Sequence, residues 1–189
     1  MAAGDVTLTV GTQLSFKNNA AFAPASATTN LEAGTPTDVE ISLASVADTA
    51  ARESAKADLG ANRAEWYSVE AAFEFAATPV SGDVVELYWA PSPSGTAANA
   101  NPMNIDGADA AAPSGIGTLA ELVRVCQFIG TFICTDDATT AIQVGHVGVF
   151  SPAERYGILI VKNESGAAFH SDNVEIHVVF NPILRNVAA

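Results

Sequence analysis

Short runs in which apolar and polar residues alternate constrain this chain more than any other feature of its sequence. Residues 67–75 carry an apolar side chain at every second position, and the same period recurs in residues 37–43, 84–90 and 174–180. A period of two places the apolar side chains on one face of a half-buried β-strand. The chain is therefore expected to fold mainly from strands.

Five further runs predict strands, at residues 6–10, 13–16, 119–134, 140–150 and 156–161. Residues 45–64 are ambiguous between a short helix and an edge strand, and we favour the strand. Residues 67–75 and 84–90 flank a turn around Pro79 and Gly82, which predicts a hairpin. Gly130, inside the run 119–134, predicts a bulge or bend.

About eight or nine strands with frequent turns and no long helix predict an all-β fold, an antiparallel β-sandwich or jelly roll. The length of 189 residues fits one domain spanning residues 1–189. An extended N-terminal arm or loop region is expected over about residues 1–44. Residues 18–36 and 91–117 are long, low in complexity and without periodicity, so they are candidates for contact with a partner.

The charge balance argues against two classes of partner. The chain has 8 Lys and Arg residues against 21 Asp and Glu residues, a net charge of −13. A nucleic-acid-binding surface needs basic side chains to neutralise phosphates, and an anionic membrane surface needs them too. We therefore expect neither nucleic acid nor membrane as a partner. The N-terminus lacks the basic and apolar regions of a signal peptide, and no apolar run approaches the roughly 20 residues of a membrane span.

Cys126 and Cys134 lie in the single apolar run 119–134. If this run is one strand, eight steps separate their Cα atoms by about 26 Å. A disulfide requires about 7 Å or less, so both cysteines are expected to be free thiols.

The residue types that carry chemistry do not occur in a recognisable pattern. His146, His170 and His177 have no metal-type spacing to a second ligand, and no G-x-S-x-G motif or phosphate-binding loop occurs. Residues 101–109 gather Asn and Asp side chains that could bind Ca²⁺, but an Asx-rich turn is the better interpretation. We expect no catalytic residue, no cofactor and no metal.

Four aromatic residues, Trp66, Tyr67, Tyr88 and Trp89, could form a carbohydrate platform. Trp66 and Trp89 are better explained as core or interface residues on paired strands, because large aromatic side chains dominate both environments.

Several segments resemble stretches of tailed-bacteriophage structural (virion) proteins. These segments cover roughly residues 45–182 and are residues 51–64, 66–75, 87–92, 151–157 and 161–168. Their motifs are strand and turn patterns and include no catalytic signature. The resemblance implies a β-sandwich protein of the virus particle and does not indicate which part of the particle.

On this basis the leading hypothesis is a capsid decoration or cement protein, located in the virion, that bridges major capsid proteins and forms a homo-oligomer. The alternatives are a tail, connector or fibre-associated β-sandwich and, from another class, a carbohydrate-binding module. Arg52 and Arg63 are scarce cations in an acidic chain, so each is expected to pair with carboxylates, within the domain or across a contact. Together with Trp66 and Trp89 they are the candidate interface residues.

Overall fold

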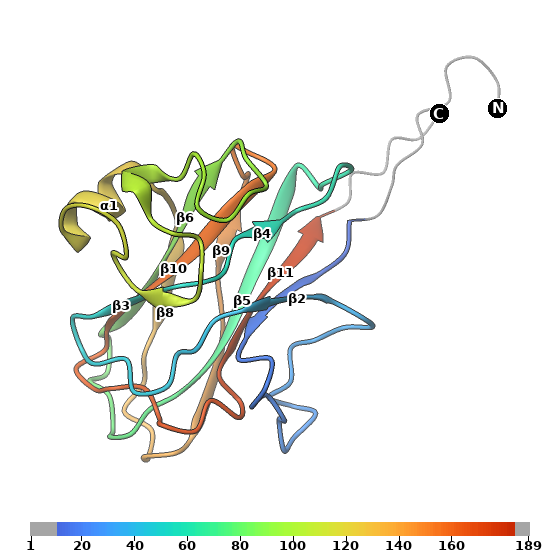
Figure 1. Ribbon diagram of the computed structural model, residues 1–189. Helices are drawn as coiled ribbons and strands as arrows, with labels where there is room; N and C mark the ends of the chain where they lie inside the picture. Colours follow the sequence, from blue (N-terminus) through green and yellow to red (C-terminus); the bar gives the residue numbers. More distant parts are fainter. Residues whose placement is uncertain (1–10, 184–189) are drawn as a thin grey trace.

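The computed structural model describes residues 11–183, which form two β-sheets packed face to face (Figure 1). Sheet A has the strand order β2-β1-β11-β5-β9. Its strands are β1 (Leu14–Lys17), β2 (Thr37–Glu40), β5 (Trp66–Glu74), β9 (Ile142–Phe150) and β11 (His177–Ile183). Strands β1 and β2 pair in parallel, whereas the other neighbours in this sheet are antiparallel.

Sheet B has the order β7-β3-β10-β6-β8, and the short strand β4 also pairs with β10. Its strands are β3 (Ala51–Glu53), β4 (Ala57–Asp58), β6 (Val84–Ser92), β7 (Ala110–Ala111), β8 (Gln127–Ile133) and β10 (Tyr156–Glu164). All its pairings are antiparallel. The prediction of an all-β sandwich is confirmed, and the jelly-roll variant of it stays a prediction.

The main core lies between the sheets and is rich in aromatic side chains. Trp89, fully buried, lies 5.7 Å from Phe180 between ring centroids, and Phe180 lies 5.2 Å from Phe150. Phe73 stacks on Phe169 at 5.1 Å. Each fully buried side chain of this size contributes roughly 1.5–3 kcal/mol, so the alternating residues that predicted strands also supply the stability of the sandwich.

A second apolar cluster lies on the outer face of sheet B. Ile158 and Ile160 of β10 are fully buried there because residues 93–126 fold back over the strand and place Ile105 and Leu122 against it. This excursion contains the 3-10 helix η1 (Pro102–Asn104) and the helix α1 (Leu119–Val125), seen at the upper left of Figure 1.

The prediction of one strand over residues 119–134 is wrong, because its first half is α1 and only its second half is β8. Thr118 caps the helix: its side chain accepts the Glu121 backbone N–H, and the Glu121 carboxylate accepts the Thr118 N–H in return. This capping box provides hydrogen-bond acceptors for backbone N–H groups at the start of the helix. In a strand, the same N–H groups would pair with a neighbouring strand. The predicted irregularity at Gly130 is confirmed, since the β6–β8 register shifts beside it.

The predicted hairpin of residues 67–75 and 84–90 is also wrong. Strand β5 lies in sheet A and β6 in sheet B, so the chain crosses between the sheets at this point. Both strands direct their apolar face into the same core, so they stack across it. Residues 45–64 form two short strands, as favoured, whereas the predicted strand at 6–10 lies outside the described residues.

Candidate interaction surface

Residues 18–36 pack on the outer face of sheet A, over β11. His177 of β11 is fully buried beneath them, and its Nε2 accepts the Leu31 N–H at 3.0 Å. Its Nδ1 lies 2.7 Å from the carbonyl oxygen of Glu175, which fixes the proton on Nδ1. Burial lowers the pKa of His177, so the ring is neutral and acts as an acceptor for the loop.

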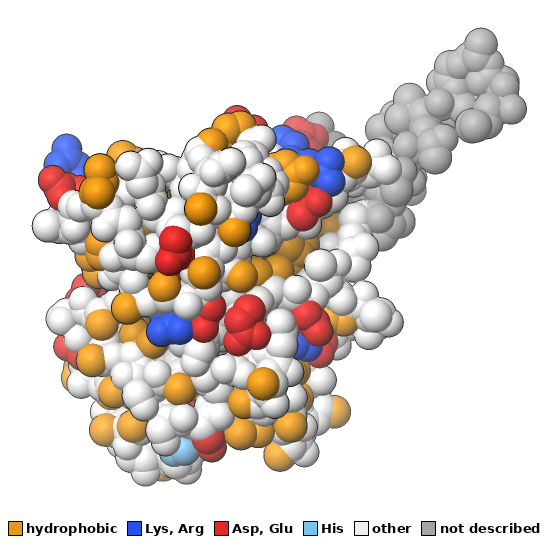
Figure 2. Space-filling view, viewed as in Figure 1, with side chains coloured by type: hydrophobic (Ala, Val, Ile, Leu, Met, Phe, Trp, Pro, Cys, Tyr) orange, Lys and Arg blue, Asp and Glu red, His pale blue; other side chains and the backbone are white. Residues whose placement is uncertain are grey.

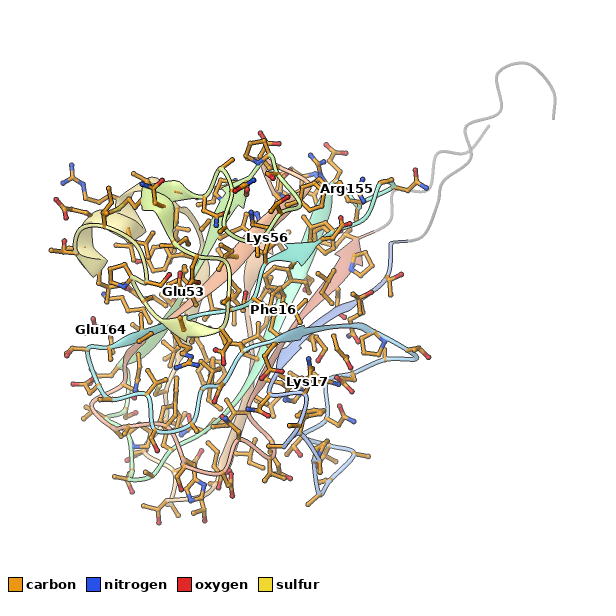
Figure 3. All side chains as sticks on the ribbon, viewed as in Figure 1. Phe16, Lys17, Glu53, Lys56, Arg155 and Glu164 are labelled. Atoms are coloured by element: carbon orange, nitrogen blue, oxygen red, sulfur yellow. The ribbon has the colours of Figure 1, made fainter. Side chains whose placement is uncertain are left out.

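Lys17 fixes the same segment from the neighbouring strand (Figure 3). Its ammonium lies 2.5 Å from a Glu32 carboxylate oxygen and 3.0 Å from Asp38, and it sits 4.7 Å above the Phe22 ring. Residues 18–36 form a loop, as expected, but β1 and β2 on either side of it are strands of sheet A, so residues 11–44 belong to the sandwich and are not an extended arm. Residues 1–10 of that prediction lie outside the described residues.

The second long segment, residues 91–117, is also anchored. The Lys56 ammonium contacts four oxygens of this segment: the Ser92 hydroxyl at 3.0 Å and the carbonyl oxygens of Ser94, Thr96 and Asn99 at 3.0, 2.7 and 2.9 Å (Figure 3). These contacts anchor the first part of the segment to the body of the domain.

Two acidic side chains fix the far part of this segment. Asp109 forms a bidentate pair with Arg52, at 2.6 and 2.7 Å, and the fully buried Glu53 accepts the Ser114 N–H at 2.8 Å. Burial raises the pKa of Glu53. The Asx-turn interpretation of residues 101–109 is confirmed at Asp106, whose carboxylate accepts the Ala108 N–H.

Strands β5 and β9 leave part of the outer face of sheet A open, and we call this surface the open face. It carries four partly exposed large apolar side chains: Trp66, Val144, Val149 and Ile183, with 37, 43, 47 and 39 % of their surface accessible. Trp66 and Ile183 are opposite each other in the register, and Val149 is opposite Ser68, which places it diagonally next to Trp66. Three of the four, Trp66, Val149 and Ile183, therefore cluster at the start of β5, whereas Val144 lies opposite Ala72, farther along the strand.

Further apolar side chains are exposed on sheet B beyond the reach of the excursion. Phe128 and Ile133 of β8 are 55 and 67 % exposed, and the Phe128 ring contacts Tyr88 at 5.3 Å between centroids. A shallow groove of about 490 Å³ lies beside α1 and is lined by Met103, Ile116, Gly117, Glu121, Arg124 and Val125.

The structure separates the four candidate interface residues. Trp66 is on the open face and Arg63 is exposed, whereas Arg52 is paired inside the domain with Asp109. Trp89 is fully buried in the core. Its assignment to an interface is therefore wrong, and so is the two-tryptophan carbohydrate platform, because Trp89 and Trp66 lie on different sheets.

Most basic side chains of the described residues are paired with carboxylates of the same domain. Lys17, Arg52, Arg155 and Lys162 each lie within 3.0 Å of a carboxylate oxygen. Figure 2 shows the same arrangement on one face of the molecule, where blue basic side chains lie beside red acidic ones. The surplus of carboxylates therefore determines the sign of the surface potential.

Both cysteines are free, as expected. Burial raises the pKa of Cys126 to about 12 and that of Cys134 to about 11, so both thiols stay protonated at neutral pH. A protonated thiol is a poor nucleophile.

Sequence reasoning missed three groups that the fold brings together: Glu74, His170 and Asp172, each with one potential ligand atom within 4.8 Å of the others. The spacing His170-Ser171-Asp172 was a signal for two of them, since side chains two apart in an extended segment can point the same way. The third residue, Glu74, is at the end of β5, about 100 residues earlier in the sequence. No local sequence pattern could therefore connect it with the other two.

No family model, curated protein or solved structure matches this chain. The helices within residues 11–183 lack the length and hydropathy of a membrane span.

Proposed function

We propose that this chain is a structural protein of a tailed-phage particle that decorates the capsid and binds the major capsid protein and copies of itself. The observation that carries the proposal is the open face, a rigid sheet surface with partly exposed large apolar side chains on a strongly acidic domain. The sequence resemblance directs the proposal to a virus particle, and the sandwich fold agrees with it.

The composition of the open face fits a protein partner. Interface cores are enriched in aromatic and apolar side chains and depleted in charge, and a tryptophan such as Trp66 is a frequent centre of binding energy. The cluster of Trp66, Val149 and Ile183 would supply such a core. Ser68, Glu70 and His146 lie on the same face of the same strands and would supply polar contacts at its rim.

The anchored segments support the same function. Residues 18–36 and 91–117 are held by Lys17, His177 and Lys56, so the domain has little conformational entropy to lose on binding. A small entropy loss on binding suits a component present in many copies, because a modest contact is then enough to bind each copy. The acidic surface keeps unassembled copies soluble at high concentration.

A charge introduced on the open face tests the proposal. In Val149→Asp, addition of purified protein to particles that lack it should leave the particles undecorated, whereas wild type binds. Ile116→Asp is the matched control, because Ile116 is 64 % exposed on the other side of the sandwich, in the excursion over sheet B. Binding by a folded Val149→Asp protein equal to that of wild type would contradict the assignment of the open face.

A tail or connector position is the alternative within the same particle. The same contact would then be made at a few sites, and binding in the experiment above would be confined to tails. The number of copies bound per particle separates the two positions.

A further inference from the structure

Glu74, His170 and Asp172 meet at the end of the sandwich farthest from residues 11 and 183 (Figure 1). Glu74 is the last residue of β5, and the other two lie in the connection between β10 and β11. The backbone joins the two segments: the His170 N–H donates to the Glu74 carbonyl oxygen at 2.8 Å, and Phe75 forms a β-bridge with Phe169. The relative position of the three side chains is therefore set by the sheet.

One atom of this group is buried without a hydrogen bond, and a largely buried carboxylate faces it. The Glu74 side chain is 9 % exposed, and its Oε1 lies 3.7 Å from His170 Nδ1. The Nδ1 atom of His170 is buried, and although it lies 3.1 Å from Asp172 Oδ1, the angles of that contact are not those of a hydrogen bond. Leaving a buried polar group unsatisfied costs roughly 1–3 kcal/mol, and more for a charged group. These groups point at one another, so an added ligand would satisfy both.

The separations between these atoms fit the edges of a metal coordination shell. Nδ1 of His170 lies 3.1 Å from Asp172 Oδ1 and 3.7 Å from Glu74 Oε1. Tetrahedral ligands bound at about 2.0–2.1 Å are about 3.3 Å apart. The two observed separations lie on either side of that value, and all three ligand atoms lie within 4.8 Å of one another, so side-chain rotations would bring them around one ion.

We infer that Glu74, His170 and Asp172 form a binding site for a divalent transition-metal ion of the Zn²⁺ type. One imidazole nitrogen and two carboxylate oxygens are ligands that Zn²⁺ accepts, and Ca²⁺ or Mg²⁺ would not select the imidazole. Two carboxylates neutralise the ion. Three protein ligands leave a further coordination position open on the exposed side, where Asp172 is 48 % exposed.

The competing occupant is a proton, which would make His170 an imidazolium between two carboxylates. Glu175 adds to the negative potential at Glu74 and would favour either cation. A metal-binding experiment distinguishes the two occupants. A metal site binds added metal saturably and with a fixed stoichiometry, whereas a protonated His170 between two carboxylates does not.

Titration of the full chain with ZnCl₂, followed by calorimetry at neutral pH, tests the inference and does not depend on the proposed function. Wild type should bind one Zn²⁺ ion per chain. At a free Zn²⁺ concentration of about 100 times the dissociation constant, the ratio of folded to unfolded protein should rise about 100-fold. The variants Asp172→Asn and His170→Ala should bind at least about tenfold more weakly.

His146→Ala is the matched control, because it removes an exposed histidine that lies outside the three-residue cluster and should bind like wild type. Asp172→Asn changes an exposed side chain and should fold normally, so a failure of His170→Ala to fold would not remove the test. Co²⁺ bound to wild type should show the intense visible bands of a four-coordinate ion. Equal Zn²⁺ affinity in wild type and Asp172→Asn, or binding without saturation, would overturn the inference and indicate nonspecific attraction to the acidic surface.

Discussion

Replacing Lys56 with methionine removes the cation that holds residues 91–117 against sheet B. The ammonium has three protons and four oxygen acceptors at 2.7–3.0 Å, and three of these acceptors are backbone carbonyl oxygens of one loop. Methionine keeps most of the apolar stem but has no donor. The carbonyl oxygens of Ser94, Thr96 and Asn99 would lose this partner.

The cost follows from these contacts. A hydrogen bond to a charged group contributes about 1.5–3 kcal/mol when it is shielded from water. Lys56 is half-buried, and water can replace part of the loss at Thr96 and Asn99, whose contacts are exposed. We therefore expect the free energy of unfolding to fall by about 2–3 kcal/mol. For a domain of this size that lowers Tm by roughly 4–12 °C.

Two measurements check the expectation, with Arg124→Met as the control because Arg124 is exposed in the same excursion. Thermal unfolding gives the change in Tm. Hydrogen exchange of the amides in residues 93–101 should become faster in Lys56→Met and stay unchanged in the control. If exchange in this segment were the same in Lys56→Met as in wild type, the ammonium would not be what anchors the loop.

Three further substitutions test other parts of the fold, each by urea denaturation. Burial lowers the pKa of His177 below its ordinary 6.5, so the neutral ring's contribution to stability is complete above about pH 6.5. As the pH falls below that value, the free energy of unfolding should decrease by up to about 1.4 kcal/mol per pH unit. The variant His177→Gln should lack this pH dependence, and parallel pH profiles of wild type and variant would contradict the expectation. Gly157→Ala would place a Cβ 2.3 Å from the Trp89 ring and should cost about 1–3 kcal/mol, so an unchanged midpoint would refute the close contact. Thr118→Ala removes the cap of α1 and should cost about 1 kcal/mol, whereas no loss would show that the cap does not stabilise the domain.

The fold class could be predicted from the sequence because each strand carries its own signature. Alternation in residues 67–75 and 84–90 correctly places one face of each strand in the core. It contains no information about the neighbouring strand, and for that reason the predicted hairpin was wrong. In residues 119–125 the apolar run concealed a helix, and the capping pair Thr118 and Glu121 was the local signal that distinguished it.

The candidate surface was harder to predict, because exposure depends on what covers a face. Trp66 and Trp89 occur in similar strand patterns, yet one lies on the open face and the other in the core. The coverage of β11 by residues 18–36 is produced by contacts between residues far apart in the sequence, such as Leu31 and His177. A segment without periodicity gives no sign of such packing.

Imaging of purified particles would show whether the protein decorates the capsid, because it locates the protein and counts its copies in one measurement. We expect density of the size of this sandwich on the outer face of the capsid, with the open face of β5 and β9 turned toward neighbouring subunits and a copy number comparable to that of the major capsid protein. A handful of copies confined to the tail, or particles without the protein, would contradict the proposal.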